Sequence, residues 1–169
     1  MTTPVLMEEA TGVRHRTPTA NRSPIAGPSD LFAVCDGWIL VQVIGQGMFR
    51  RWAQLVGRPD LIADPRFGSD ILRGENGEIL SGIMGEWCAP RTVTECLAAL
   101  RDARIPATHL MPPSEVLTSP SGITASLGWM EWPGLPGPIP VAKPVATVSG
   151  MNFDEMASAP VLGADTDEV

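Results

Sequence analysis

The chain has 169 residues, enough for one domain with a sizeable core, and 44% of them are hydrophobic against 18% charged, as in globular proteins. Its net charge of −7 argues against nucleic acid as a partner, because no basic surface neutralises a phosphate backbone. The longest apolar run, WILVQVIG, is much shorter than the ~20 residues that span a bilayer, so no membrane insertion is expected.

Cysteine and histidine usage argues against a disulfide framework and against a metal site. Cys35, Cys88 and Cys96 form an odd set without CxxC spacing, which is typical of reduced thiols inside a cell. His15 and His109 have no further ligand at metal spacing. Because no signal peptide is apparent either, we expect a cytoplasmic protein without a bound metal.

Residues 1–29 contain four prolines and little hydrophobic periodicity, which predicts an extended linker. Two apolar runs follow, LFAV and WILVQVI, and Cys35-Asp36-Gly37 separates them. Asp-Gly between apolar runs is a strong turn signal, so this segment predicts a β-hairpin.

Three helices are expected after the hairpin. The first carries an apolar face over residues 48–56 and ends near Gly57. The second covers about residues 70–88, although each of its four glycines weakens it by ~1 kcal/mol relative to alanine. The third begins at a capping-box pattern, in which Thr92 and Glu95 satisfy each other's free backbone donors.

The remaining sequence predicts shorter elements. RIPATHLM indicates a strand near residues 107–111, PPSE a helical turn, and ASLGWMEW and VATVS two strands separated by the Pro/Gly-rich PGLPGPIPVAKP. This order of elements predicts an α+β or small α/β fold. We expect a linker (1–29), a small α/β domain (30–118) and an irregular segment with short strands and an acidic tail (119–169).

Gly45-Gln46-Gly47 joins the second predicted strand to the first predicted helix. Glycine lets a backbone approach a ligand closely. The helix directs unpaired N–H groups and its positive dipole end toward the turn, which suits a phosphate, carboxylate or thioester oxygen. The alternative is that two glycines only turn a corner, since the pattern is not a complete GxGxxG. Gly45, Gln46 and Gly47 are therefore the candidate ligand-facing residues.

No catalytic constellation is visible elsewhere. The serines lack a GxSxG context, so a hydrolytic triad has no support. Asp60 and Asp64 are expected to be loop and capping residues. Cys88 and Cys96 fall on apolar helix faces and are expected in the core rather than as nucleophiles.

Several segments in order resemble one family: ANRSPIAGPSDLFAVCDGWILVQV, LVGRPDLIADPRF, Arg73 with Asn76 ahead of a helix, the Thr-x-x-Glu helix, RIPATHLMPPSEVL and APVLGADTDEV. Together they resemble the C-terminal half of a class III CoA-transferase, the family that includes carnitine and formyl-CoA transferases and α-methylacyl-CoA racemases. The resemblance runs from about residue 12 to the end. It implies the small domain of that fold, a hairpin or small sheet packed on three helices, with an extended Pro/Gly-rich C-terminal segment.

The resemblance also implies that the Asp that attacks the acyl-CoA carbonyl, and most CoA-binding groups, belong to an N-terminal Rossmann-like part to which nothing in this chain corresponds. In the family's interlocked rings the C-terminal segment packs on that part. Residues from about 145 onward are therefore expected to lack their usual neighbour. The apolar candidates for such a surface are Val145, Val148, Met151, Phe153, Val161 and Leu162.

In this family the turn after the Asp-Gly strand faces the thioester, and racemase members carry an acidic residue there that helps to move the α-proton. The matching residue is Gln46, a carboxamide that cannot take a proton at ordinary pH. The resemblance thus favours a transferase over a racemase. Pro28-Ser29-Asp30 replaces the usual Pro-Tyr-Gly, and Asp165 a common His, which leaves the subfamily open.

We therefore expect the C-terminal part of a CoA-transferase-like protein, without a catalytic residue of its own and inactive alone. Coenzyme A and acyl-CoA would be substrates, and no covalently bound cofactor is expected. The expected partner is an N-terminal CoA-transferase half or a second copy of the chain. A non-catalytic interaction or regulatory module and a racemase fragment are the alternatives.

Overall fold

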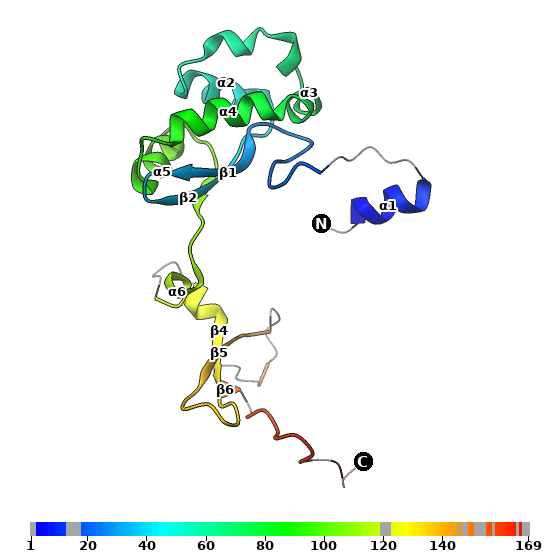
Figure 1. Ribbon diagram of the computed structural model, residues 1–169, viewed down its shortest axis with the longest axis vertical. Coiled ribbons are helices and arrows are strands. Elements are labelled where there is room, and N and C mark those ends of the chain that lie inside the picture. Colours follow the sequence, from blue (N-terminus) through cyan, green and yellow to red (C-terminus); the bar gives the residue numbers. More distant parts are fainter. Residues whose placement is uncertain are drawn as a thin grey trace. The chain divides into compact units, whose positions relative to one another are not determined.

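The computed structural model describes residues 3–12, 18–118, 123–144, 146, 149–150, 155–156, 158–164 and 166. The chain divides into two compact units, Met1–Leu110 and Met111–Val169. Helices and short strands occur in both units (Figure 1), so the fold is α+β, as the sequence predicts.

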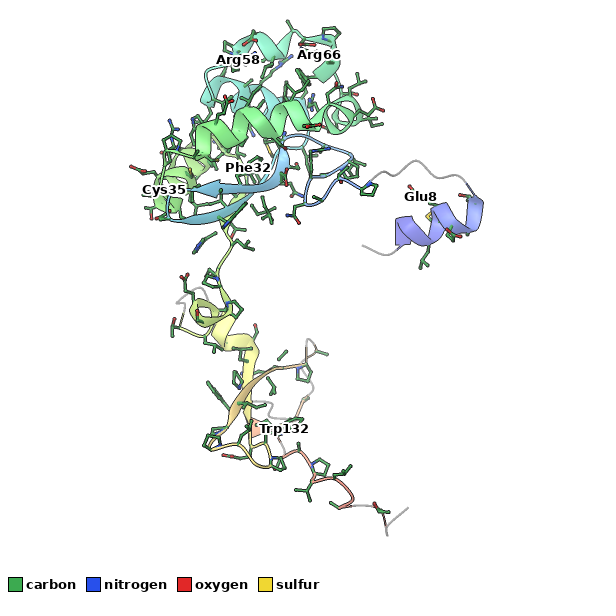
Figure 2. All side chains as sticks on the ribbon, viewed as in Figure 1. Glu8, Phe32, Cys35, Arg58, Arg66 and Trp132 are labelled. Atoms are coloured by element: carbon green, nitrogen blue, oxygen red, sulfur yellow. The ribbon has the colours of Figure 1, made fainter. Side chains whose placement is uncertain are left out.

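The first unit contains a three-stranded antiparallel sheet in the order β1-β2-β3. Strands β1 (Ser29–Val34) and β2 (Gly37–Gln42) form the predicted hairpin, and β3 (Ala107–His109) pairs with the other edge of β2. Only Cys35 and Asp36 lie between β1 and β2, because the ends of the two strands pair directly. Figure 2 shows Cys35 at this end of the hairpin.

The hairpin turn is fixed against the start of a helix. Asp36 accepts a hydrogen bond from the backbone N–H of Val93, at 2.7 Å, in the first turn of α5 (Val93–Asp102). A Cβ added to Gly37 would lie 3.3 Å from the Val93 side chain. The Asp36-Gly37 pair therefore forms the turn and also allows the turn to pack closely against α5.

Short helices follow the hairpin, and two of them, α4 and α5, pack directly on the sheet. In chain order they are α2 (Gln46–Leu55), the 3₁₀ helices η1 (Pro59–Ile62) and η2 (Pro65–Phe67), α3 (Asp70–Glu75), α4 (Gly77–Cys88) and α5. The predicted capping box of α5 is confirmed: Thr92 Oγ1 accepts from the Glu95 N–H at 3.2 Å, and Glu95 accepts from the Thr92 N–H at 2.8 Å.

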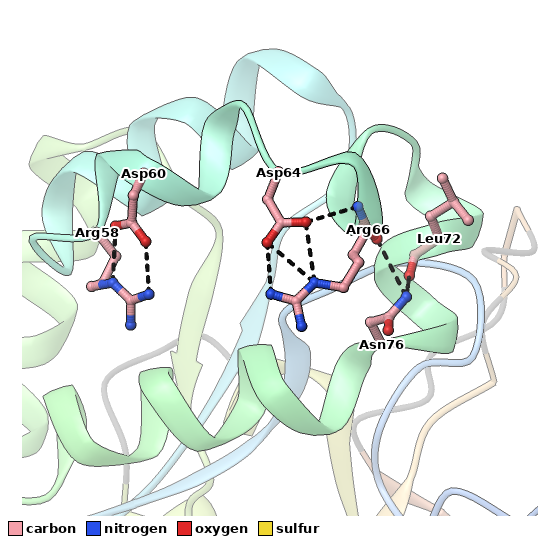
Figure 3. A network of polar contacts seen from close by, with 6 residues as sticks. All are labelled: Arg58, Asp60, Asp64, Arg66, Leu72 and Asn76. Atoms are coloured by element: carbon pink, nitrogen blue, oxygen red, sulfur yellow. Dashed lines mark hydrogen bonds and ion pairs between the residues drawn. The ribbon is translucent and has the colours of Figure 1, made fainter.

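The single helix predicted over residues 70–88 is wrong, because α3 and α4 meet at Asn76. The side-chain Nδ2 of Asn76 donates to the carbonyls of Leu72, at 2.9 Å, and Arg66, at 3.3 Å (Figure 3). The backbone N–H of Asn76 also donates to Leu72. The side chain of Asn76 thus satisfies the Leu72 carbonyl of α3 and the Arg66 carbonyl of η2, and its bond to Leu72 competes with a continuous helix.

The core of the first unit lies between the sheet and α2, α4 and α5. Inward side chains of β2 pack against aromatic and aliphatic side chains of these helices, and the indole N–H of Trp52 donates to the sulfur of Met84 at 3.2 Å. Burial of each side chain of this size stabilises the fold by about 1.5–3 kcal/mol. The fully buried side chains include Ile39, Val41, Val43, Phe49, Trp52, Leu80, Met84 and Leu100.

The prediction of an extended segment over residues 1–29 is wrong for its first part, which contains helix α1 (Thr3–Thr11). Pro4 lies in the first turn of α1, where a missing backbone N–H removes no helical hydrogen bond. The hydroxyl of Thr11 donates to the Met7 carbonyl at 2.8 Å, near the end of the helix.

The second unit holds α6 (Pro113–Val116), η3 (Ile123–Ser126) and a sheet ordered β5-β4-β6. Strand β4 (Leu127–Met130) lies antiparallel to β5 (Ile139–Ala142) and parallel to β6 (Glu155–Met156).

Strand β5 falls in the Pro/Gly-rich segment that was expected to be irregular. Pro140 is tolerated there because β5 is an edge strand of its sheet, where a backbone donor is dispensable. Of the predicted strand VATVS, residues 145, 147 and 148 lie outside the described residues.

The predicted apolar surface of the tail is only partly within the described residues. Val145, Val148, Met151 and Phe153 lie outside them, whereas Val161 and Leu162 are exposed. None of the described helices is long and apolar enough to cross a membrane.

Candidate functional site

The three residues of the predicted turn have different structural roles. Gly45, with φ 82° and ψ 154°, occupies a backbone region that is essentially restricted to glycine. Gly47 is exposed and has no positive φ, and a Cβ added there would meet only the Arg51 side chain, at 3.7 Å. The turn therefore requires glycine at position 45, whereas nothing in the structure requires it at position 47.

Asp70, the first residue of α3, binds the backbone of the Gly45–Gly47 turn. Its two carboxylate oxygens each lie 3.0 Å from the backbone nitrogen of Gly45. Ser69 precedes it and caps α3 by accepting from the N–H of Leu72 at 3.3 Å. Asp70 is not predicted as a site residue from the sequence, because it lies 25 residues beyond Gly45 and carries no motif of its own.

Arg73 lies behind the turn, with 1% of its surface exposed. Its Nη1 donates to Asp70, its Nη2 to the side-chain oxygen of Gln46, and its Nε to the carbonyl of Phe67 at 2.8 Å. The guanidinium also stacks 4.4 Å from the centre of the Phe49 ring. Burial lowers the pKa of Arg73 and the negative charge of Asp70 opposes this shift, so the guanidinium stays charged.

The backbone around Arg73 is closely packed against the segment that precedes β1. A Cβ on Gly74 would lie 2.1 Å from the carbonyl oxygen of Pro24. A Cβ on Gly27 would lie 2.8 Å from the carbonyl oxygen of Arg73. These close approaches fix the position from which the Arg73 side chain reaches Gln46.

Arg51 anchors the other side of the turn. Its Nη1 donates to the Gly47 carbonyl at 3.1 Å, and its Nε and Nη2 donate to the carbonyls of Ala103, at 2.9 Å, and Arg104, at 3.1 Å. These bonds tie the start of α2 to the end of α5. An open groove of about 540 Å³ runs beside Arg51, but it does not include Gly45, Gln46 or Gly47.

The first turn of α2 leaves donors available. Among the described residues, no acceptor is hydrogen-bonded to the N–H groups of Gln46, Gly47 or Met48. Unpaired donors of this kind, at the positive end of a helix dipole, favour a carbonyl or carboxylate oxygen.

Asp60 and Asp64 have the structural roles that the sequence predicts (Figure 3). Asp64 caps η2 by accepting from the N–H of Arg66 at 2.9 Å, and Asp60 in η1 binds the Arg58 side chain. Hydrogen bonds from these two arginines lower the pKa of Asp64 and Asp60 respectively. Neither carboxylate is directed at the turn.

Cys88 and Cys96 are buried, as predicted. Burial raises the pKa of the Cys88 thiol to about 12 and also raises the pKa of Cys96, which disfavours the reactive thiolate. Within the described ranges, no group of three His, Cys, Asp or Glu side chains could hold a metal ion.

The chain belongs to CoA-transferase family III, whose sequence model matches residues 1–166. The family resemblance inferred from the sequence is thereby confirmed. Among individual proteins, the chain is 29% identical over 106 residues to the succinyl-CoA–D-citramalate CoA-transferase of Chloroflexus aurantiacus. It is 27% identical over 135 residues to the probable CoA-transferase Rv1866 of Mycobacterium tuberculosis. These alignments cover 62% and 79% of this chain, respectively.

Solved structures share the fold. A CAIB/BAIF family protein from Brucella suis matches 98% of this chain with a TM-score of 0.68 and 20% identity. Rv3272 from M. tuberculosis matches 98% of it with a TM-score of 0.65 and 20% identity. The chain covers 42% and 43% of these two proteins, 26% of the citramalate enzyme and 17% of Rv1866. It thus spans less than half of the length of each relative.

Proposed function

We propose that this chain forms the C-terminal part of an enzyme that transfers CoA from an acyl-CoA thioester to a carboxylate, and that Gly45, Gln46 and Gly47 line the acyl side of the site. Membership of CoA-transferase family III supports the reaction class. The observation that carries the assignment of the turn is that the N–H groups of Gln46, Gly47 and Met48, beside a carboxamide side chain, have no acceptor in the part of the chain that the structure describes.

In this proposal the chain binds and orients, and the nucleophile is the N-terminal Asp that the family resemblance implies. That carboxylate would attack the thioester carbonyl and displace CoA as its thiolate, giving a mixed anhydride. The thiolate would then attack the Asp carbonyl and release the donor carboxylate, leaving an enzyme–CoA thioester, which is covalent catalysis. The acceptor carboxylate would attack this thioester and form a second anhydride, from which the released CoA thiolate takes the acceptor acyl group and frees the Asp. The unpaired N–H groups of α2 would donate to the oxygen on which negative charge develops. Because Arg73 neutralises Asp70, the developing charge would not face an unpaired carboxylate.

The first test is CoA exchange between an acyl-CoA and a free carboxylate. We expect no activity from the 169-residue chain alone and restored activity when it is co-expressed with the N-terminal half of a family III enzyme. Exchange by the isolated chain at enzyme-like rates would show that the nucleophile lies within these residues.

A sharper test uses Gly47→Ala in the assembled enzyme. The turn tolerates a methyl group at position 47, so the variant should fold normally, yet the added methyl narrows the approach to the α2 donors. We expect a higher KM for acyl-CoA and a lower kcat. Gly82→Ala, which adds a methyl into open space on α4, is the matched control and should leave both parameters unchanged.

A second candidate is a non-catalytic interaction or regulatory module. The observation that favours it is that Asp70 accepts a hydrogen bond from the Gly45 N–H and Arg73 donates one to the Gln46 oxygen. Part of the hydrogen-bonding capacity of the turn is therefore already used within the chain. Co-expression separates the two functions: a stable but inactive complex with the N-terminal half supports the module. A homo-oligomer of the chain is the other expected partner, and sedimentation of the purified chain detects it.

A racemase role is the weakest alternative, because the Gln46 carboxamide, unlike a carboxylate, cannot act as the base that removes an α-proton at ordinary pH. If the assembled enzyme incorporates no deuterium at the α-carbon of a 2-methylacyl-CoA in D₂O, this alternative is removed.

A further inference from the structure

Arg73 imposes a direction on the Gln46 side chain. A guanidinium has only donors, so the carboxamide atom that faces Nη2 must be the oxygen. The amide nitrogen of Gln46, which has two N–H donors, is then directed away from Arg73. In the described part of the chain no acceptor binds this nitrogen, and Gln46 is only half-buried.

The geometry points to Arg73 as a positioning residue, which presents the Gln46 amide as a hydrogen-bond donor to an oxygen of the bound acyl group. This inference rests on the proposed function, in which the turn faces acyl-CoA. It adds the chemistry of the contact: the preferred ligand atom is an acceptor, such as a thioester carbonyl or carboxylate oxygen, and not a hydroxyl or amine donor.

The contacts that the Arg73 guanidinium makes could not be made by lysine. The guanidinium binds Asp70, Gln46 and the Phe67 carbonyl through three different nitrogens while it stacks on Phe49. A lysine ammonium is a point donor on a flexible stem and cannot reproduce this fork. Arg73→Lys would keep the charge next to Asp70 and release Gln46.

The same contacts hold the carboxamide close to the α2 donors. Gln46 is the first residue of α2, and its own N–H and that of Gly47 are unpaired in the described part of the chain. A ligand oxygen at the helix start would therefore meet backbone donors and the side-chain amide together.

The test is ¹⁵N NMR of the ¹⁵N-labelled 169-residue chain, alone and in complex with the unlabelled N-terminal half of a family III enzyme, which is expected to supply most of the CoA-binding groups. Acetyl-CoA is the probe and is added to the complex. The chain has three glutamines, and Gln42 and Gln54 are exposed, so their side-chain amides serve as internal references. We expect the heteronuclear NOE of the Gln46 side-chain amide to exceed that of both references. In Arg73→Lys it should fall to their level while the rest of the spectrum stays dispersed.

Acetyl-CoA should shift the Gln46 side-chain amide together with the Gly47 backbone amide, and Arg73→Lys should weaken its binding roughly two- to tenfold, the effect of one misplaced hydrogen bond. Arg66→Lys is the control, because Arg66 also stacks on a phenylalanine and pairs with an aspartate but is exposed and does not contact the turn. If Arg73→Lys does not fold, Gln46→Met leaves Arg73 and Asp70 in place and should weaken binding by the same factor.

The outcomes distinguish the inference from the function on which it rests. A Gln46 amide as mobile as Gln42 and Gln54 overturns the positioning role. A shift of Gly47 without a shift of the Gln46 amide overturns the donor role and leaves the proposed function intact. If acetyl-CoA shifts nothing at the turn in the complex with the N-terminal half, the proposed function loses its support, and the donor role is overturned with it.

Discussion

Asp70 binds the backbone N–H of Gly45 with both carboxylate oxygens, each 3.0 Å from the nitrogen. The contact joins the strand-to-helix turn to α3, 25 residues later. The same carboxylate pairs with the buried Arg73. The Asp70 side chain therefore binds the backbone of the turn and also neutralises the cation that binds the Gln46 side chain. Asp70 is therefore the residue on which the geometry of the turn most depends.

Asp70→Asn should destabilise the fold by about 1–3 kcal/mol. Loss of one partner from a buried ion pair costs about 3–5 kcal/mol, and we reduce this value because a third of the Asp70 side chain is exposed. Urea unfolding at pH 7 measures the change. Asp60→Asn, which breaks the exposed pair with Arg58, is the control and should leave the urea midpoint almost unchanged. Equal shifts in both variants would contradict the role of Asp70.

Thiol labelling tests the burial of the core cysteines. At pH 8 only Cys35, which is exposed, should react quickly with a thiol reagent such as 5,5′-dithiobis(2-nitrobenzoate). With its pKa at about 12, Cys88 carries a thiolate fraction of only about 10⁻⁴ at this pH, and burial also blocks access. All three thiols should react in denaturant, and Cys35→Ser should remove the fast phase. Rapid labelling of two or more native thiols would show that α4 and α5 are not packed as described.

The elements that the sequence predicts correctly depend on signals within a few residues. Asp36-Gly37 between apolar runs predicts the hairpin, and the Thr92/Glu95 spacing predicts the start of α5. Helix α2 follows from the periodicity of its apolar face. The break between α3 and α4 was missed because no proline interrupts residues 70–88, while the side chain of Asn76 ends the first helix.

The candidate site could be predicted only in part, for a physical reason. Gly45, Gln46 and Gly47 are contiguous, so their turn is visible in the sequence. The contact between Arg73 and Gln46 spans 27 residues and exists only because α3 packs beside the start of α2. Without tertiary structure, Arg73 and Asp70 are two charged residues near a helix start, as are Arg66 and Asp64.

The capping box gives stability a defined pH dependence. Hydrogen bonds from the backbone and side chain of Thr92 lower the pKa of Glu95. A carboxylate with a lowered folded-state pKa stabilises the fold above its unfolded value of about 4.5, and this contribution is lost as the pH falls through the folded-state pKa. Glu95→Gln should therefore have a lower urea midpoint than the parent at pH 7. The two midpoints should converge below pH 4, and a constant difference from pH 7 to pH 3 would refute this account.

Two glycine substitutions, which are expected to change the free energy of unfolding in opposite directions, test the packing behind Arg73. Gly74→Ala places a methyl carbon 2.1 Å from the carbonyl oxygen of Pro24, and a backbone atom cannot move aside as a flexible side chain can. We expect a loss of about 2 kcal/mol or more in the free energy of unfolding. Gly82→Ala, in the interior of α4 with open space around it, should instead gain up to about 1 kcal/mol from helix propensity.

The NMR signal of Gln46 links this packing to the turn. Because Gly74 follows Arg73 directly, displacement of α3 by the new methyl group should also free the Gln46 side-chain amide, whereas Gly82→Ala should leave that amide unchanged. If Gly74→Ala is as stable as the parent chain, the segment that contains Pro24 does not press on α3 in solution. In that case the position of Arg73 must depend on the contacts of its side chain with Asp70, Phe67 and Phe49.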